Sequence, residues 1–421
     1  MSSRQLVEVL ADVYAHGPGK DVRPGPAPPY RAPAAPGGVA LTALAAAGEV
    51  GDRLVKVLTA ALAPRRYEPW NGFNEHRAYP SPRAAYLVDV AVRCGAADWL
   101  VDPVRGWLHP VRPSSVPSAV PAGSAGPTSL AVPTGLVLLE RPGRLPAGYG
   151  RLADALAALE AGHVAGALVE AAAGHGLQVT VRTQGRQLTV ELGPTSAAAG
   201  PRPRLRAVRS SGLSPRGLGA DPRPLPAAVF DRLVAAAYRP PTGSPAAWPG
   251  LRHTVAVGNV TDRPAGWYDL PPPAGTPEAS AAGAATSAAS PPVAPPPVAP
   301  TRAGDAIGQV QQAYTYPRTE VDVAGMPLAW LVSADVGAVV RADGPAGYRR
   351  LLHTVGALAQ HVGTAAAEAG LFCRPVRAVR EAAAEAAAAL PAGHDLIYLL
   401  LIGRSRVRDF AYDLSDPEVP L

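Results

Sequence analysis

The sequence repeats itself, and this repeat constrains the possible folds more than any other feature. The tetrapeptide Pro-Ala-Gly-Tyr stands at 146–149 and again, letter for letter, at 345–348. Each copy opens a long segment of helical pattern that contains a glycine, Gly162 in the first and Gly356 in the second. Self-similarity of this kind is the signature of a duplicated structural unit.

Further matches lie on both sides of this pair, in the same order. Gly-Leu follows each helical segment, at 176–177 and 370–371, and each half then finishes on a strand pattern, at 179–192 and 396–402. Upstream, the halves share a helix start, a Ser-Pro loop, a strand and a tryptophan turn: Asp52-Arg53-Leu54-Val55, Ser81-Pro82, 85–92 and Asp98-Trp99-Leu100 in the first, and Asp231-Arg232-Leu233-Val234, Ser244-Pro245, 253–257 and Gly266-Trp267-Tyr268 in the second. We interpret the chain as a tandem duplication, the alternative being two small domains that are alike only in composition.

Strands mixed with helices and joined by long connections predict an α+β fold in each half. We expect an N-terminal segment, 1–38, that is partly disordered, a first half at 39–195 and a second half at 196–421. A Pro-, Ala- and Ser-rich stretch at 271–304 is predicted to be a disordered insertion in the second half. A shorter stretch of the same kind, 112–135, occupies the corresponding place in the first half.

Several classes of site are excluded by the residues that the chain lacks. Its two cysteines, Cys94 and Cys373, are too few for a disulfide framework or a cysteine zinc module. The nine histidines show neither His-x-x-x-His nor His-Glu-x-x-His spacing, so no metal site is predicted. Dinucleotide-binding, P-loop and nucleophile-elbow motifs are also missing.

The net charge of +6 is carried almost entirely by arginine, since Lys20 and Lys56 are the only lysines. These arginines are scattered and not interleaved with aromatic residues, so no nucleic-acid partner is expected. The N-terminal sequence has no signal-peptide pattern, and apolar runs such as Ala382–Leu390 are too short to span a bilayer. We therefore expect a soluble, cytoplasmic protein without a membrane partner.

The second half resembles the nitroreductase superfamily of flavin enzymes, and within it the azoline dehydrogenases. The resemblance covers about Arg206–Arg406 and depends on an ordered set of short motifs: Arg206-Ala207-Val208-Arg209-Ser210-Ser211, Thr242-Gly243-Ser244-Pro245, Pro264-Ala265-Gly266-Trp267-Tyr268, Gly347-Tyr348-Arg349, Gly370-Leu371 and Ile402-Gly403-Arg404. It implies a homodimer-type fold with FMN at the interface. Since a two-fold dimer needs two copies of one surface, the duplicated chain would form an intrachain pseudo-dimer with one flavin site, built mainly by the second half and completed by a degenerate first half.

The resemblance also implies which residues bind FMN. Arg209, Ser210 and Ser211 stand where the family holds the flavin phosphate, and guanidinium and hydroxyl groups suit a phosphate dianion. Leu213 replaces a further basic residue of the family, so Arg206 or Arg216 would substitute for it. A second basic group is implied just after the last strand, at Arg404 and Arg406. The alternative is that all these arginines are solvated surface residues.

Two more positions are implied to contact the flavin. Gly370-Leu371 corresponds to the place near flavin N5, where protein groups tune the cofactor. The same glycine is also the residue type that commonly ends a helix. Ser244 would lie against the flavin face or the ribityl chain, and an ordinary turn is the alternative.

Dehydrogenation also needs a base, and here the sequence departs from the family. The Lys-Tyr pair of azoline dehydrogenases is absent, because Ala342-Asp343 stand at those positions. The candidates nearby are Tyr348, Arg349, His353 and Asp343, of which a histidine can titrate near neutral pH. The alternative is that they are structural, as is indicated by Tyr149, which repeats Tyr348 in the half where no chemistry is expected.

The resemblance implies an FMN-dependent dehydrogenase that oxidises thiazolines or oxazolines to azoles, with oxygen as the final acceptor. Its substrate would be a ribosomally made peptide cyclised by a partner cyclodehydratase, as in thiopeptide antibiotic biosynthesis. Two alternatives stay open. One is an NAD(P)H-dependent nitroreductase-like enzyme, and the other is a non-catalytic scaffold of a peptide-modifying complex.

Overall fold

The computed structural model describes residues 3–14, 38–68, 75–111, 130–184, 187–196, 217–238, 243–244, 250–270, 299–406 and 411–414. Several predicted features lie wholly or largely outside these residues. They are most of the N-terminal segment, both Pro-rich stretches and the Arg206–Ser211 cluster.

The first half is built on a seven-stranded antiparallel sheet. Its strands, in spatial order, are β1 (Val39–Ala40), β6 (Trp107–Pro110), β5 (Ala97–Asp102), β4 (Val88–Cys94), β7 (Pro133–Glu140), β9 (Gln187–Thr195) and β8 (Leu177–Gln184). Helices α2 (Glu49–Leu62) and α3 (Leu152–Gly174) pack against it. This half also contains the short 3-10 helices η1 (Leu41–Ala47), η2 (Pro82–Ala84), η3 (Pro142–Arg144) and η4 (Ala147–Tyr149).

The second half is built on a six-stranded antiparallel sheet. Its strands, in spatial order, are β12 (Arg302–Ala303), β11 (Gly266–Leu270), β10 (Arg252–Val257), β13 (Leu328–Ala334), β15 (Asp395–Gly403) and β14 (Phe372–Val376). The helices of this half are α4 (Ala227–Tyr238), α5 (Ala306–Ala313), η5 (Val323–Gly325), α6 (Val336–Glu368) and α7 (Glu381–Ala388). A small third sheet pairs β16 (Tyr412–Asp413) with β2 (Arg66–Tyr67), which in turn pairs with β3 (Glu75–His76).

The two large sheets have the same topology, which confirms the predicted duplication. The order β6-β5-β4-β7-β9-β8 in the first half matches β12-β11-β10-β13-β15-β14 in the second, strand for strand along the chain. In both halves a long helix follows the fourth of these strands along the chain, α3 after β7 and α6 after β13. The chain is therefore an α+β tandem duplication that forms a pseudo-dimer within itself.

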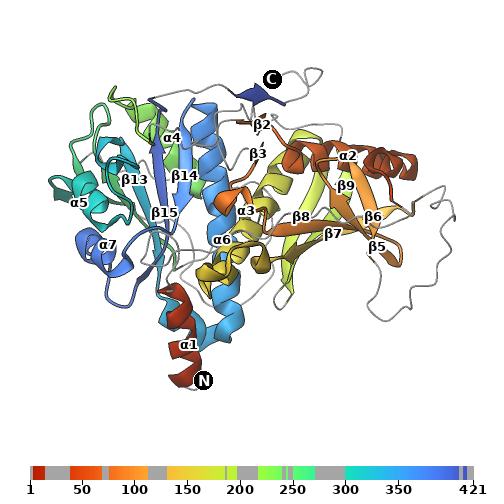
Figure 1. Cartoon of the computed structure of the whole chain (residues 1–421), viewed down its shortest axis with the longest axis horizontal. Coiled ribbons are helices and arrows are strands. Elements are labelled where there is room, and N and C mark those ends of the chain that lie inside the picture. Colours follow the sequence, from red (N-terminus) through yellow and green to blue (C-terminus); the bar gives the residue numbers. More distant parts are fainter. Residues whose placement is uncertain are drawn as a thin grey trace.

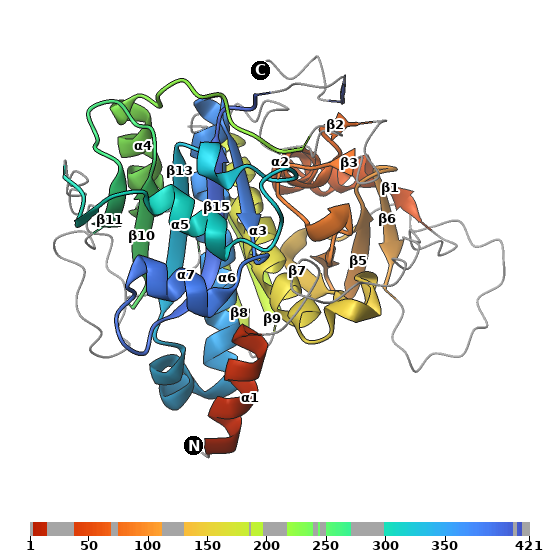
Figure 2. The same ribbon diagram turned by 60° about the vertical axis from the view of Figure 1, so that its left-hand side comes forward.

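Helices α3 and α6 lie side by side between the two sheets (Figures 1 and 2), and the repeated glycines explain how they approach so closely. A Cβ atom on Gly162 would lie 2.1 Å from the backbone oxygen of His353, and one on Gly356 would lie 2.0 Å from that of Leu159. Since real Cβ atoms essentially never come within 3.0 Å of such atoms, both positions require glycine in this packing. The pair of glycines therefore marks the junction of the halves.

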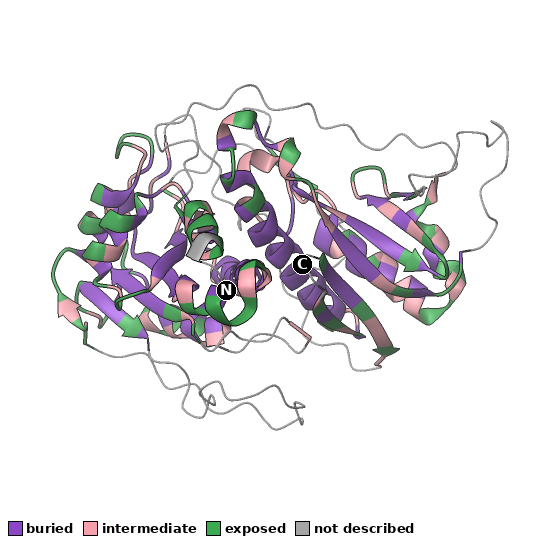
Figure 3. Ribbon diagram, turned by 90° about the horizontal axis from the view of Figure 1, so that it is seen from below, coloured by how far each residue is buried: buried purple, intermediate pink, exposed green. Residues whose placement is uncertain are grey.

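Helix α3 is buried on all sides, and Figure 3 shows buried residues concentrated on the central helices and the sheets. Among the described residues it is the one helix that is long and apolar enough to cross a membrane. However, 94% of its most apolar window is buried inside the protein, as in the core helix of a globular fold. Helix α1 (Ser3–Val13) packs against α6 (Figure 2).

Three sequence-based predictions of local structure were wrong in detail. Trp99 and Trp267 do not lie in turns, because both are residues of paired strands, β5 and β11. The stretch 179–192 forms a hairpin of β8 and β9 instead of one strand. Finally, α6 begins at Val336, before the Pro-Ala-Gly-Tyr motif, and Gly344 (φ 66°) kinks it just ahead of Pro345.

Candidate active site

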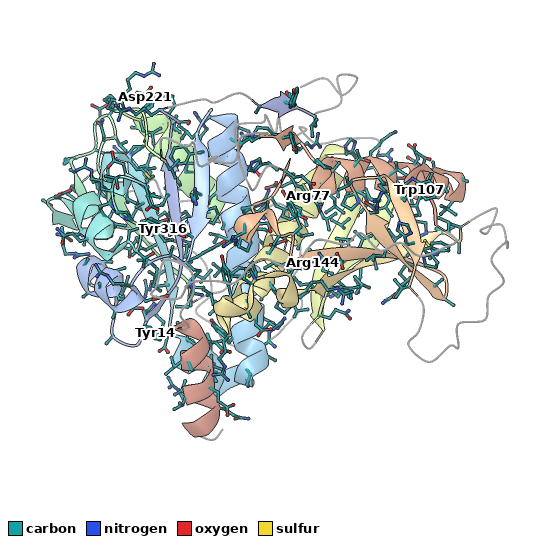
Figure 4. All side chains as sticks on the ribbon, in the orientation of Figure 1. Tyr14, Arg77, Trp107, Arg144, Asp221 and Tyr316 are labelled. Atoms are coloured by element: carbon teal, nitrogen blue, oxygen red, sulfur yellow. The ribbon has the colours of Figure 1, made fainter. Side chains whose placement is uncertain are left out.

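A cavity of about 300 Å³ lies between the two halves. The first half contributes residues of the 76–86 segment together with η4 and the start of α3. The second half contributes Tyr314, Tyr316, residues 373–378 and Tyr398. Figure 4 labels Arg77 and Tyr316, which line the cavity from opposite halves. The junction thus provides a site that neither half encloses by itself, and we call it the open site.

A buried carboxyl group, Glu160 of α3, lies in the wall of the open site with 2% of the residue exposed. The Ser81 hydroxyl donates to its Oε2 at 2.7 Å, and the same hydroxyl oxygen accepts from the backbone N–H of Tyr86 at 2.8 Å. The hydrogen bond from Tyr86 fixes the direction in which the Ser81 hydroxyl donates. Within the described part of the chain, Glu160 Oε1 has no hydrogen-bond partner.

The pKa of Glu160 is raised to about 8 because burial disfavours its charged form. Four influences lower it again without offsetting the burial: the hydrogen bond from Ser81, the nearby backbone of Leu87, and the charges of Arg77 and Arg144. At neutral pH this carboxyl is therefore mostly protonated, and it can exchange a proton near physiological pH.

Two further polar residues join the halves beside Glu160. His163, one turn further along α3, lies with Nδ1 3.4 Å from Gln360 Oε1 of α6 and Nε2 3.3 Å from the Tyr398 hydroxyl of β15. Gln360 Nε2 in turn donates to the backbone oxygen of Ala78 at 3.0 Å. These bonds fix the segment that leads to Ser81 against both central helices.

The opposite wall carries buried groups that are only partly satisfied. Arg377 is 5% exposed, and its Nη2 donates to the backbone oxygen of Val13 of α1 and pairs with Glu381 Oε1 at 3.5 Å. Its Nε and Nη1 have no acceptor among the residues that the structure describes, and neither does the Tyr314 hydroxyl have a partner there. Burial raises the pKa of Tyr314 to about 12, which keeps this hydroxyl neutral. Since buried donors are normally paired, this wall is suited to a ligand that accepts hydrogen bonds.

At the pseudo-equivalent place, the described residues Gly243–Ser244 bond directly to β8 and α6. The backbone N–H of Val181 donates directly to the Gly243 oxygen at 2.9 Å. Ser244 Oγ lies 3.0 Å from His361 Nε2, and His361 Nδ1 lies 2.7 Å from Glu170 Oε1. The serine predicted to contact the flavin is therefore bonded within this second place, which we call the closed site.

The structure brings four other predicted flavin-binding residues close together. Gly370 (φ 73°) ends α6, with its N–H donating to Ala367, so the helix-ending role of this glycine is realised. Leu371 is buried and leads into β14, whose Phe372 pairs with Gly403 immediately before Arg404. Arg404 and Arg406 continue along the segment 219–221 through backbone hydrogen bonds. These four residues meet at one end of the β14–β15 pair and are not among the residues that line the cavity.

The three predicted catalytic residues also lie outside the cavity lining. Arg349 is ion-paired with Glu140 at the end of β7, and His353 Nε2 lies 3.1 Å from the same carboxylate. Burial lowers the pKa of His353, although Glu140 opposes the change. Burial also raises the pKa of Tyr348 to about 12, against the charge of Arg377. Their catalytic role stays a prediction, and the contacts of Arg349 and His353 favour the structural alternative.

Sequence reasoning missed Glu160, Arg374, Arg377 and the partner role of Ser81. In the sequence Ser81 stands out only as a match to Ser244, and Glu160 belongs to no motif. A signal was nevertheless present, because α3 is apolar on every side and holds few ionisable residues. A charged residue in a helix buried all round must be paired, neutral or functional.

The sequence matches no protein-family profile and no curated protein. The structure is similar to that of a candidate nitroreductase from Anabaena variabilis, over 95% of this chain and 99% of that chain, with a TM-score of 0.64 and 14% identity. Two other solved structures align with about half of the chain, each with a TM-score of 0.31. One is a chain of the E. coli microcin synthetase McbBCD complex with truncated pro-MccB17 bound (14% identity, 48% of this chain and 71% of that chain), and the other is a candidate nitroreductase from Ralstonia eutropha (19% identity, 51% and 88%). The full-length likeness establishes a nitroreductase-like fold for the duplicated chain.

Proposed function

We propose that the chain is a flavin-dependent oxidoreductase that binds FMN at the open site. The observation that carries this proposal is the cavity itself, which lies at the junction of the two halves and holds one buried acid, Glu160, and a wall of unsatisfied donors. The full-length fold likeness supports the same class of activity.

The residues of the cavity fit a large, polar, anionic cofactor. The Nε and Nη1 groups of Arg377 and the Tyr314 hydroxyl would bind its oxygens, and Arg374 adds positive charge to the same wall. Arg206, Arg209, Ser210 and Ser211 remain proposed phosphate ligands, together with Arg404 and Arg406. FMN, when bound, accepts a hydride at N5.

We further propose that the substrate is an azoline-containing peptide supplied by a cyclodehydratase. The support for this finer assignment is the ordered set of motifs in the second half. In this reaction two hydrogens leave the azoline ring, one as a proton and one as a hydride, so the site needs a proton acceptor beside the hydride acceptor. The open site contains a group that could act as this proton acceptor, the carboxyl of Glu160.

The halves are proposed to divide near residue 196. The support is that the first sheet ends with β9 at Thr195, and every strand of the second sheet comes from residue 252 onward. On this division, FMN would bind once per chain.

The first test is the visible absorption of the purified full-length protein. We expect a flavin spectrum and, after denaturation, release of one FMN per chain, identified by chromatography against FAD and riboflavin. Protein that is colourless and takes up no FMN on reconstitution contradicts the proposal and favours the scaffold alternative.

The second test separates the substrate classes. A thiazoline-containing peptide incubated with the flavin-loaded protein in air should lose two hydrogens by mass spectrometry and produce hydrogen peroxide. NAD(P)H should reduce the bound flavin slowly. Rapid bleaching by NAD(P)H, with no change in the thiazoline peptide, would instead support the nitroreductase-like alternative.

A further inference from the structure

The open site contains a proton-exchanging group in the half that the sequence identified as degenerate. We infer that Glu160 is the residue that accepts the proton from the substrate bound in this cavity, and that Ser81 is its positioning residue. The inference rests on the proposed function and assigns the base that the missing Lys-Tyr pair left open.

The geometry supports this role in three ways. Glu160 lines the cavity while almost no solvent reaches it. Its Oε2 is held by Ser81, whose own oxygen is held by Tyr86, so the carboxyl group has a fixed orientation. Its Oε1 is left without a partner among the described residues, so it is available to a ligand.

Glu170, the other buried glutamate of α3, has the contacts expected of a purely structural residue. Both oxygens of Glu170 are occupied, Oε1 by His361 at 2.7 Å and Oε2 by the Thr364 hydroxyl at 2.8 Å. Glu170 is not among the residues of the cavity wall. Glu160 differs because one of its oxygens is unpaired and the cavity is beside it.

The reaction balances with this assignment. A C–H bond of the azoline would break and its proton pass to Oε1 of ionised Glu160, while the adjacent ring carbon would give up a hydride to bound FMN and a C=C bond would form. The two electrons and the hydrogen of that hydride, together with the proton held by Glu160, would then convert dioxygen to hydrogen peroxide. One azoline and one dioxygen are consumed, and one azole and one hydrogen peroxide are formed.

Several charged or titratable groups surround Glu160 and affect its titration. Arg77 and Arg144 lower its pKa, Tyr79 and Tyr86 face it from the 76–86 segment, and His163 lies one turn along the same helix. A pH profile for this site therefore has to be compared between variants and not interpreted alone.

The central experiment compares wild type, Glu160→Gln and Glu170→Gln as full-length, flavin-loaded proteins. Glutamine keeps the size of the side chain and can still accept from Ser81. We expect Glu160→Gln to keep its flavin and to lose azoline turnover by about 100- to 10,000-fold. The wild-type rate should rise with pH towards about 8, and Glu170→Gln should retain this rise.

Two further variants distinguish proton transfer from a structural role. Glu160→Asp keeps a carboxylate and should restore part of the turnover with a pH-dependent rise. Ser81→Ala removes a hydrogen bond that lowers the pKa of Glu160, so the rise should move to higher pH. A merely structural Ser81 would reduce the rate without moving the profile.

A readout without turnover is the pH dependence of unfolding. Because Glu160 has a higher pKa in the folded state, its stabilising contribution is present at low pH and is lost as pH rises towards 8. The unfolding midpoint of Glu160→Gln should therefore rise relative to wild type between pH 5 and pH 8.

The outcomes separate the two proposals. Flavin-loaded Glu160→Gln that turns over at the wild-type rate overturns this inference and leaves the proposed function intact. Unfolding curves that shift equally with pH in wild type and Glu160→Gln also overturn it. Protein that binds no flavin overturns the proposed function itself.

Discussion

The open and closed sites occupy equivalent places in a duplicated fold, yet they differ in what fills them. At the open site a serine, Ser81, holds a buried acid beside a cavity. At the closed site Ser244 is held by His361, and the backbone of Gly243 bonds directly to β8. Among the described residues, one place thus holds direct protein contacts, while the other holds a cavity with unsatisfied polar groups.

This difference shows that the two sites of a fused duplication can acquire different residues. In a symmetric homodimer, any residue that closes one site closes both. After fusion the two places can vary independently, and here the first half supplies the acid and the serine of the open site while the second half supplies the wall with Arg377. The half that looks degenerate in sequence is a contributor to the site.

The largest effect is expected where both sites depend on the same contact, the crossing of α3 and α6. Gly162→Val would place side-chain atoms against the His353 backbone, where even a Cβ has only 2.1 Å. Overpacking against backbone cannot be relieved by a rotamer change, so we expect a loss of more than about 3 kcal/mol of unfolding free energy. Urea denaturation measures this loss of unfolding free energy. Gly143→Ala, at an exposed glycine with open space around its Cβ, is the matched control and should change little.

The next effect should be confined to the open site. Arg377→Met keeps the length of the side chain but removes the unsatisfied N–H groups, and we expect FMN affinity to fall by about 10- to 100-fold, the value of one charged hydrogen bond. Titration of the flavin-free protein with FMN, followed by fluorescence quenching, measures it. Counted from Gly370 and Gly176, Thr183 of β8 is the equivalent position, and Thr183→Ala should leave the affinity unchanged. Equal losses in both variants would show that the two sites do not differ in the way proposed.

The closed site should respond in stability and not in cofactor binding. Gly243 has φ +91°, and a Cβ there would lie 2.1 Å from the Val179 backbone oxygen. Gly243→Ala should therefore cost about 1–3 kcal/mol of stability through strain and the displaced loop. Because the open site shares no residue with this loop, FMN affinity should stay within twofold of wild type. A parallel loss of FMN would mean that the closed site also takes part in binding.

The duplication could be predicted from the sequence because its markers are backbone requirements. Gly162 and Gly356 are needed at a helix crossing, and Gly176 and Gly370 are needed at positive φ, so the residue type itself records the geometry. The tryptophans gave the wrong prediction for the opposite reason. Trp99 and Trp267 pack equally well in a turn or a strand, and cross-strand pairing, which is a long-range property, decides between them.

The site was less predictable, since its residues come from segments far apart in the chain. Glu160 and Arg377 are separated by more than half of the sequence, and nothing local to either shows that they share a cavity. The helical candidates Arg349 and His353 were near a family motif in sequence, but Glu140 of the other half lies against them. Proximity in the chain does not reveal such a contact, because Glu140 belongs to the other half.

The smallest predicted effect compares one buried titratable group from each half, whose responses to acid have opposite signs. His253, in the second sheet, accepts from Trp330 Nε1 at 3.1 Å, and burial lowers its pKa to about 4. Its folded form resists protonation, so its contribution to stability is lost as pH falls below the unfolded pKa of 6.5. Between pH 7 and pH 6 this loss is about 0.7 kcal/mol of unfolding free energy, whereas the contribution of Glu160, with a folded pKa of about 8, increases by about 1.3 kcal/mol over the same interval.

The experiment measures the change in unfolding free energy from pH 7 to pH 6 for wild type and two variants. His253→Gln should make acidification more stabilising than in wild type, and Glu160→Gln should make it less stabilising. Two variants that shift this change in the same direction would show that the two halves do not hold oppositely perturbed groups.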